Sequence, residues 1–196
     1  MSALPESFVT PQQYLDRERA AETKSEYLRG EVFAMAGASR EHTLIAGNIS
    51  RILGQQLVDR LCEVYQSDMR VKVNHTELYT YPDVVVVCGE PEFEDVQVDT
   101  LLNPRVLVEV LSPSTADYDR GGKFAHYRRL RSLQEYVLIS QDRPLVEHYV
   151  RQTDITWLLT ERSSLDHILE LSSIDCRLAL AEIYHTVRFP SEETND

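Results

Sequence analysis

The strongest constraint on the fold is the run VLVEVL at residues 106–111. Successive residues of a strand point to opposite faces, so the three valines share one face and two leucines flank Glu109 on the other. A half-exposed strand would carry polar residues at every second position, whereas here both faces are apolar apart from one carboxylate. The run therefore predicts a strand buried on both sides, inside an α/β domain with helices on both faces of its sheet.

The segments that follow extend this prediction. A turn-rich connector, SPSTADYDRGG, leads to an expected helix over 119–130 and then to a second strand, EYVLIS, at 135–140. The strand–helix–strand order predicts a right-handed crossover and a parallel pair of strands. We expect one domain over residues 1–196, with its core over about 10–186, a mixed sheet and a disordered tail over 190–196. The other expected elements are a helix over 11–20, a hairpin turning at Arg29-Gly30, an amphipathic helix over 39–61, strands near 63–66, 69–73 and 83–87, a loop over 89–99, a hairpin of LVEHYVR and ITWLLT, and a helix near 178–185.

Composition excludes several classes of protein. The apolar runs have strand length and are far too short to span a membrane, and no secretory signal is expected near Met1. Cys62, Cys88 and Cys176 are widely separated and fit neither a disulfide framework nor a zinc site, which predicts a reducing, cytoplasmic compartment.

Charge is distributed unevenly along the chain. The net charge of −12 argues against a generic nucleic-acid coat protein. Residues 105–131 nevertheless carry six Arg or Lys against three Asp or Glu, while residues 89–99 hold five acids and no base. The basic window is either a solvated helix face or a surface that binds an anion.

Two carboxylates are candidates for the chemistry. An isolated charged Glu109 among aliphatic residues costs several kcal/mol unless a cation, a proton or a donor compensates it. Asp83, in TYPDVVVV, either opens a strand from a Pro-Asp turn or joins Glu109 in an oxygen-rich site suited to Mg²⁺. Pairing of Glu109 with an arginine, or its protonation, are the alternatives to a metal.

A lysine follows in the expected helix. Asp119, Lys123 and Tyr127 are spaced at i, i+4 and i+8, which places them on one helical face. If that helix packs back over the strand 106–111, the Lys123 ammonium approaches Glu109; otherwise Lys123 is an ordinary solvated lysine. The hydroxyls of the SPST loop and the helix N-terminus suit phosphate oxygens.

These residues resemble a known family. The order Pro82-Asp83, then Glu109 on a strand, then a lysine resembles the PD-(D/E)XK nuclease superfamily, which has the restriction-endonuclease-like fold. More narrowly, the chain is similar over about 10–184 to the Uma-type restriction endonuclease family of bacterial proteins. The stretches that carry the resemblance are EYLRGEVFAMAGAS with His42 following, YPDVVVV, VLVEVLSPST, and DYDRGGKFAHYR leading to EYVLIS. VEVLSPST followed by DRGGK is the specific part.

The resemblance implies a Mg²⁺- or Mn²⁺-dependent endonuclease that hydrolyses DNA phosphodiester bonds with a metal-activated water. Asp83, Glu109 and the Val110 carbonyl would bind the metal, and Lys123 would orient the water or stabilise the charge that develops. One departure is that Leu111 occupies the position of the superfamily's lysine, so this role would have moved to Lys123.

The resemblance also implies an outer tier and a DNA surface. Glu26 would complete the metal site, and His42 would contact a phosphate or position water; the alternatives are a solvated hairpin residue and a structural histidine. Tyr127 joins this tier through its place on the helical face. Nucleic-acid contacts are expected from Ser112, Ser114, Thr115, Arg120 and Arg128.

Other functions remain open from the sequence. The chain could be a binding module for nucleic acid or protein that has the nuclease fold without catalysis, or a phosphodiesterase that acts on small nucleotides. Divalent-metal binding separates the module from the enzyme, and competition by short nucleotides identifies the phosphodiesterase. A homodimer would bring two sites to the two strands of a duplex, although no residue requires one.

Overall fold

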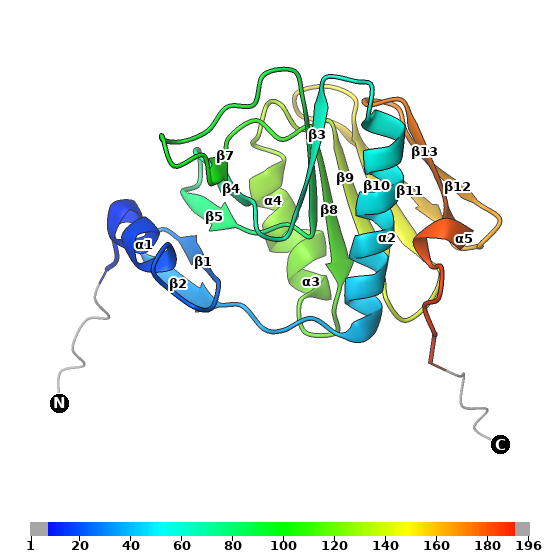
Figure 1. The fold of residues 1–196 in the computed structure, drawn as a ribbon, viewed down its shortest axis with the longest axis horizontal. Coiled ribbons are helices and arrows are strands. Elements are labelled where there is room, and N and C mark those ends of the chain that lie inside the picture. The colour runs from blue at the N-terminus through cyan, green and yellow to red at the C-terminus, as the bar shows by residue number, and fades with distance from the viewer. Residues whose placement is uncertain (1–7, 191–196) are drawn as a thin grey trace.

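The computed structural model describes residues 8–190 and shows an α/β fold with two large sheets (Figure 1). The predicted disordered tail lies outside the described residues from position 191 onward. Within residues 8–190, no helix is long and apolar enough to cross a membrane.

The six-stranded sheet contains the run that dominates the sequence. Its order is β11-β10-β9-β8-β6-β3, and only β8 and β9 run parallel. The parallel pair predicted from the strand–helix–strand order is therefore confirmed. The strands are β3 (Cys62–Gln66), β6 (Val84–Cys88), β8 (Val106–Leu111), β9 (Glu135–Ser140), β10 (Val146–Arg151) and β11 (Trp157–Arg162).

Two hydrophobic cores cover the two faces of this sheet. The three valines of β8 pack with helix α2 (Arg40–Leu57), while Leu107 and Leu111 pack with Tyr127 on the opposite face. The small sheet of β12 (Ile168–Leu171) and β13 (Cys176–Ala179) and the last helix, α5 (Leu180–Ile183), complete the α2 side. The predicted mixed sheet with helices on both faces is confirmed.

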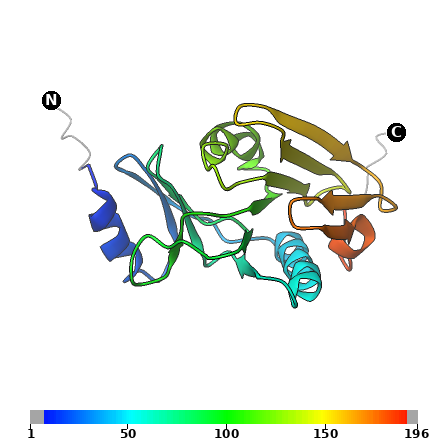
Figure 2. The ribbon, with the colours of Figure 1, turned by 90° about the horizontal axis from the view of Figure 1, so that it is seen from above.

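A second sheet lies beside the first and carries α1 (Pro11–Glu18) on its outer side (Figure 2). Its order is β2-β1-β5-β4-β7. The predicted hairpin at Arg29-Gly30 is its β1–β2 pair, where Gly30 has φ +98°. The strands are β1 (Ser25–Leu28), β2 (Glu31–Ala34), β4 (Arg70–Val73), β5 (Leu78–Thr80) and β7 (Thr100–Leu101). The sequence predicted one sheet instead of two, because β5 and β7 are too short to show a periodic pattern.

The helix expected over 119–130 begins and ends earlier. It consists of α3 (Ala116–Tyr118), a π-helical segment η1 (Asp119–Lys123) and α4 (Phe124–Tyr127). The π segment widens the turn, and such segments occur frequently at functional sites. A Cβ on Gly122 would lie 2.7 Å from the Tyr118 ring, which explains the glycine at this turn. The helix expected near 178–185 is also shorter, because residues 176–179 pair with β12 instead.

The prediction for two of the cysteines was wrong. Cys62 and Cys88 form a disulfide between the directly paired positions of β3 and β6, and Cys176 is a free, buried thiol. Sequence separation concealed this pair, because the antiparallel ladder of β3 and β6 brings together residues 26 positions apart. Cysteine content therefore no longer supports a reducing compartment.

The acidic segment 89–99 is held against the second sheet. Arg19 contacts Asp95 and Asp99, at 2.8 and 2.7 Å, and the buried Arg70 contacts Asp99 at 2.9 Å. Lys72 pairs with Glu94. These ion pairs hold the segment that the sequence predicted only as a loop over 89–99.

Candidate functional site

Glu109 lies in the middle of the molecule, on the β8 face that packs against the helix of residues 116–127. Only 5% of the residue is exposed. Its Oε1 atom accepts a hydrogen bond from the Tyr127 hydroxyl at 2.8 Å and lies 3.0 Å from the Lys123 ammonium. Glu109 is thus compensated by a lysine rather than by the arginine considered from the sequence.

Asp83 reaches the same place from the neighbouring strand. It stands one residue before β6, where Val84 pairs with Val108 of β8, so the register places it beside Glu109. Its Oδ2 atom accepts a hydrogen bond from the Val110 backbone N–H at 2.7 Å. In an antiparallel ladder the N–H and C=O of one residue face the same neighbour, so the Val110 carbonyl lies on the Asp83 side of β8.

Lys123 is buried among three carboxylates. Its side chain is 8% exposed, and Nζ lies 3.0 Å from Glu109, 3.3 Å from Glu26 and 3.6 Å from Asp119. The helix packs back over β8, as its hydrophobic contacts with Leu107 and Leu111 show. The structure therefore brings Lys123 to Glu109 as predicted, although the lysine stands 14 positions away in sequence.

Burial and charge shift the ionisation of this pair. Burial raises the pKa of Glu109 to about 8, and Lys123 opposes the increase while Asp83 and Asp119 add to it. Burial alone would lower the pKa of Lys123, but Glu109, Glu26 and Asp119 raise it well above its ordinary value. The two groups are coupled: the Lys123 ammonium lowers the pKa of Glu109, and the Glu109 carboxylate is the group that raises the pKa of Lys123 most. Contacts with three carboxylates favour the ammonium, so Lys123 is charged at neutral pH.

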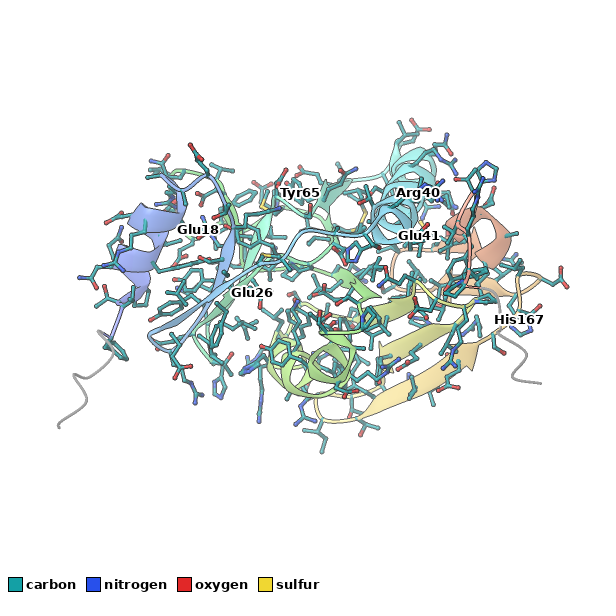
Figure 3. The ribbon with its side chains drawn as sticks, turned by 90° about the horizontal axis from the view of Figure 1, so that it is seen from below. Glu18, Glu26, Arg40, Glu41, Tyr65 and His167 are labelled. Atoms are coloured by element: carbon teal, nitrogen blue, oxygen red, sulfur yellow. A yellow bond between two sulfur atoms is a disulfide. The ribbon has the colours of Figure 1, made fainter. Side chains whose placement is uncertain are left out.

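Glu26 enters from the second sheet, in the region between α1 and the helix of residues 116–127 (Figure 3). Its side chain is 15% exposed, which excludes the solvated hairpin residue that the sequence left open. The Thr80 hydroxyl, on the paired strand β5, donates a hydrogen bond to Glu26 and lies 3.5 Å from the Tyr127 hydroxyl. Glu26, Thr80 and Tyr127 thus join the two sheets at this site.

His42 approaches Asp83 from the start of α2. The Ser39 hydroxyl caps the helix by accepting a hydrogen bond from the His42 N–H, and the His42 Nε2 atom lies 2.7 Å from Asp83 Oδ1. The Asp83 carboxylate is therefore held at both oxygens, by Val110 and by His42. His42 therefore contacts the Asp83 carboxylate instead of standing alone on the surface.

The donors of this site suit a hard divalent cation. Three carboxylates, Glu26, Glu109 and Asp119, contact the single Lys123 ammonium. Asp83 adds a fourth carboxylate beside Glu109, so acidic groups outnumber the one lysine in a mostly buried place. Mg²⁺ typically takes one or two carboxylates and keeps several waters, so Asp83, Glu109 and the Val110 carbonyl fit its requirements. Within residues 8–190, no group of three or more His, Cys, Asp or Glu side chains is arranged to hold a metal ion. Two carboxylates and one carbonyl leave the other positions around such an ion to water, as Mg²⁺ prefers.

The expected nucleic-acid contacts lie in different settings. The Ser112 hydroxyl bonds those of Ser114 and Thr115, at 3.1 and 2.9 Å, in the loop that follows β8. The Arg120 guanidinium is paired with Glu147: Nε and Nη2 lie 2.8 and 2.6 Å from Oε1, and Nε lies 3.1 Å from Oε2. Its contact with nucleic acid stays a prediction. The Arg128 side chain is exposed.

Two polar residues of the site were not predicted for it. Asp119 is 3% exposed and contacts Lys123, and their i, i+4 spacing was the signal that could have identified it. Thr80 is fully buried, and no sequence pattern marks it because its role depends on strand pairing.

Known proteins are similar to this chain in sequence or in fold. Residues 11–181 match the family described as "Uma2: Putative restriction endonuclease". Two Synechocystis proteins, described as uncharacterized proteins sll1609 and slr1290, are 43% identical over 164 residues and 36% identical over 181 residues. These matches cover 84% and 92% of this chain, and 93% and 94% of the relatives.

A solved structure gives an independent likeness. A crystal structure from Anabaena variabilis, described as a putative nuclease belonging to DUF820, superposes on this chain with a TM-score of 0.67. The superposition covers 84% of this chain and 91% of that chain. At 17% identity this likeness concerns the fold, and it confirms the predicted restriction-endonuclease-like architecture.

Proposed function

Since the chain belongs to the Uma2 restriction endonuclease family, we propose that it is a Mg²⁺- or Mn²⁺-dependent endonuclease that hydrolyses phosphodiester bonds of DNA. The family and the fold support a nuclease, without specifying its metal or its substrate. The metal, the DNA substrate and the role of each residue below are our proposal.

One observation carries the proposal: Asp83 bonds the N–H of the residue that follows Glu109, while Lys123 stands 3.0 Å from Glu109. Two carboxylates and a lysine thus converge from three separate stretches of sequence. Asp83, Glu109 and the Val110 carbonyl would hold the metal, and Glu26 would complete its surroundings. A bound divalent cation polarises the scissile phosphate and lowers the pKa of water.

The protein's own groups supply the rest of the chemistry. Lys123 is an ammonium held in place by carboxylates, so it can orient a water or stabilise charge on the phosphate oxygens as it develops. His42 and the Val110 N–H hold the Asp83 carboxylate in one orientation, and the Tyr127 hydroxyl does the same for Glu109. Fixed groups of this kind need little reorganisation during the reaction.

The substrate would be held through its backbone. Ser112, Ser114 and Thr115 offer hydroxyls beside the site, and Arg128 offers an exposed cation. Phosphate contacts of this kind bind without sequence specificity and weaken as salt increases. A cytoplasmic location and a homodimer stay predictions.

A cleavage assay tests the proposal. Supercoiled plasmid and single-stranded DNA would be incubated with Mg²⁺, Mn²⁺ or chelator, using the native protein, Glu109→Gln and Asp83→Asn. We expect metal-dependent nicking that both substitutions reduce by at least about 100-fold, because each removes a charged ligand of the metal. Glu161→Gln, an exposed change on β11, is the matched control.

Three results would contradict the proposal. Cleavage that survives both substitutions would come from a contaminating nuclease. Mn²⁺ binding without cleavage of DNA would direct the search to small nucleotides, and neither binding nor cleavage would favour the binding module. Circular dichroism would first establish that both variants fold.

A further inference from the structure

The Lys123 ammonium is shared by three carboxylates that belong to different parts of the fold. Glu109 lies on β8 and Glu26 on β1, while Asp119 lies one turn before Lys123 in η1. The first two contacts therefore depend on how strands and helix are placed against each other. The third lies within one helical segment and moves with Lys123.

A divalent cation at Glu109 would change this arrangement. Glu109 is the nearest partner of the ammonium, at 3.0 Å, and the same carboxylate is a proposed ligand of the metal. Two cations on one buried carboxylate repel each other strongly, since the interior screens charge poorly. The ammonium must then rely on its other partners, and Glu26 faces the same competition.

The surroundings of Asp119 allow it to bind the Lys123 ammonium. The residue is 3% exposed, and its backbone carbonyl accepts a hydrogen bond from the Tyr136 hydroxyl at 3.1 Å. The π segment and the contact of Gly122 with the Tyr118 ring fix the turn that joins Asp119 to Lys123. The present contact of 3.6 Å is the longest of the three, which leaves room for it to shorten.

We propose that Asp119 is a positioning residue of the reaction: it holds the Lys123 ammonium beside the site when a divalent cation takes Glu109. This inference rests on the proposed function, since it assumes a metal at Glu109. Asp119 acts only through Lys123. Without Asp119, the ammonium stays on Glu109 and Glu26 and competes with the metal.

A double-mutant cycle measured by Mn²⁺ binding tests this without relying on activity. Electron paramagnetic resonance would titrate free Mn²⁺ against native protein, Asp119→Asn, Lys123→Met and the double variant. We expect Asp119→Asn to weaken binding about 10-fold or more when Lys123 is present, in line with other residues that orient ligands of a metal. With methionine at 123 the competitor is gone, so binding should be tighter than native and the effect of Asp119→Asn should fall below about 3-fold.

Asp117→Asn, an exposed change in α3, is the charge-matched control and should leave Mn²⁺ binding as in the native protein. If Lys123→Met does not fold, Asp119→Glu provides the second route. It keeps the anion, so it should retain Mn²⁺ affinity and kcat at saturating Mn²⁺ to within about 5-fold, whereas Asp119→Asn should lose both.

The outcomes separate the two proposals. Equal weakening by Asp119→Asn in both backgrounds would overturn the inference, because Asp119 would then act on the metal by charge alone. Loss of affinity in Asp119→Glu equal to that in Asp119→Asn would also overturn it. Absence of Mn²⁺ binding by the native protein would overturn the proposed function, and this inference with it.

Discussion

The Asp83 carboxylate accepts a hydrogen bond from the Val110 N–H at 2.7 Å, across the point where β6 begins and β8 continues. Pairing of the two strands stops at Val84, which leaves the Val110 backbone group without a strand partner on that side. A side chain takes the place of the missing backbone partner. The strand end thus becomes a place where a carboxylate is held rigidly beside Glu109.

Replacing His42 should weaken the metal site without removing a ligand. His42→Ala frees Asp83 Oδ1 from the 2.7 Å contact, so the carboxylate becomes mobile. We expect Mn²⁺ affinity to fall about 10- to 100-fold, the usual effect of losing a residue that orients a metal ligand. Calorimetric titration would measure it, with the exposed His167→Ala as control. Unchanged affinity in His42→Ala would show that Val110 alone orients Asp83.

The stability of the metal-free protein should fall as pH rises from about 4.5 to 8. Burial raises the pKa of Glu109 from 4.5 to about 8, so in this range the folded protein retains a proton that the unfolded chain has released. The free energy of unfolding should therefore decrease by up to about 1.4 kcal/mol per pH unit from this group. Urea unfolding in chelator at several pH values would measure the slope.

The comparison with Glu109→Gln isolates this contribution. Glutamine does not titrate, so the difference in unfolding free energy between native protein and variant should change across the same pH range. Glu161→Gln, on the exposed edge strand, should run parallel to the native protein. A pH-independent difference between native and Glu109→Gln would mean that Glu109 stays ionised throughout.

Removing the disulfide should cost stability but not the site. The Cys62–Cys88 bond closes a loop of 26 residues, and loop entropy predicts a loss of about 3 to 4 kcal/mol in the double Ser variant. Denaturant unfolding with and without reductant would measure it. Reductant should destabilise the native protein and leave the double Ser variant unaffected; equal stability of both proteins without reductant would show that the bond does not form in solution.

Arg128→Ala should weaken DNA binding evenly across sequences. An exposed cation that contacts phosphate contributes charge without reading bases, so the slope of log affinity against log salt should decrease by about one. Fluorescence anisotropy at several salt concentrations would measure it. Arg51→Ala, an exposed change on α2 across the six-stranded sheet, should leave the slope unchanged. An unaltered slope in Arg128→Ala would exclude this arginine from the DNA surface.

Local patterns predicted much of the six-stranded sheet. The run 106–111 indicated a strand buried on both faces, and the following helix and strand indicated its parallel partner. Both signals are local, because periodicity and connection order lie within about 35 consecutive residues. The hairpin β1–β2 and the strand β4 were predicted, but their assembly into a second sheet was missed, because β5 and β7 have only three and two residues, too few to establish a period.

The sequence by itself determined that Glu109 is a buried carboxylate in need of a partner, because five aliphatic neighbours leave it no access to water. Only the tertiary structure decided which residues are the partners of Glu109. Asp83, Lys123 and Glu26 come from segments far apart in the chain, and backbone pairing and helix packing bring them to one point. The same holds for the Cys62–Cys88 pair. Local sequence encodes burial and periodicity, whereas these contacts depend on registers and packing distances that form only when the whole chain folds.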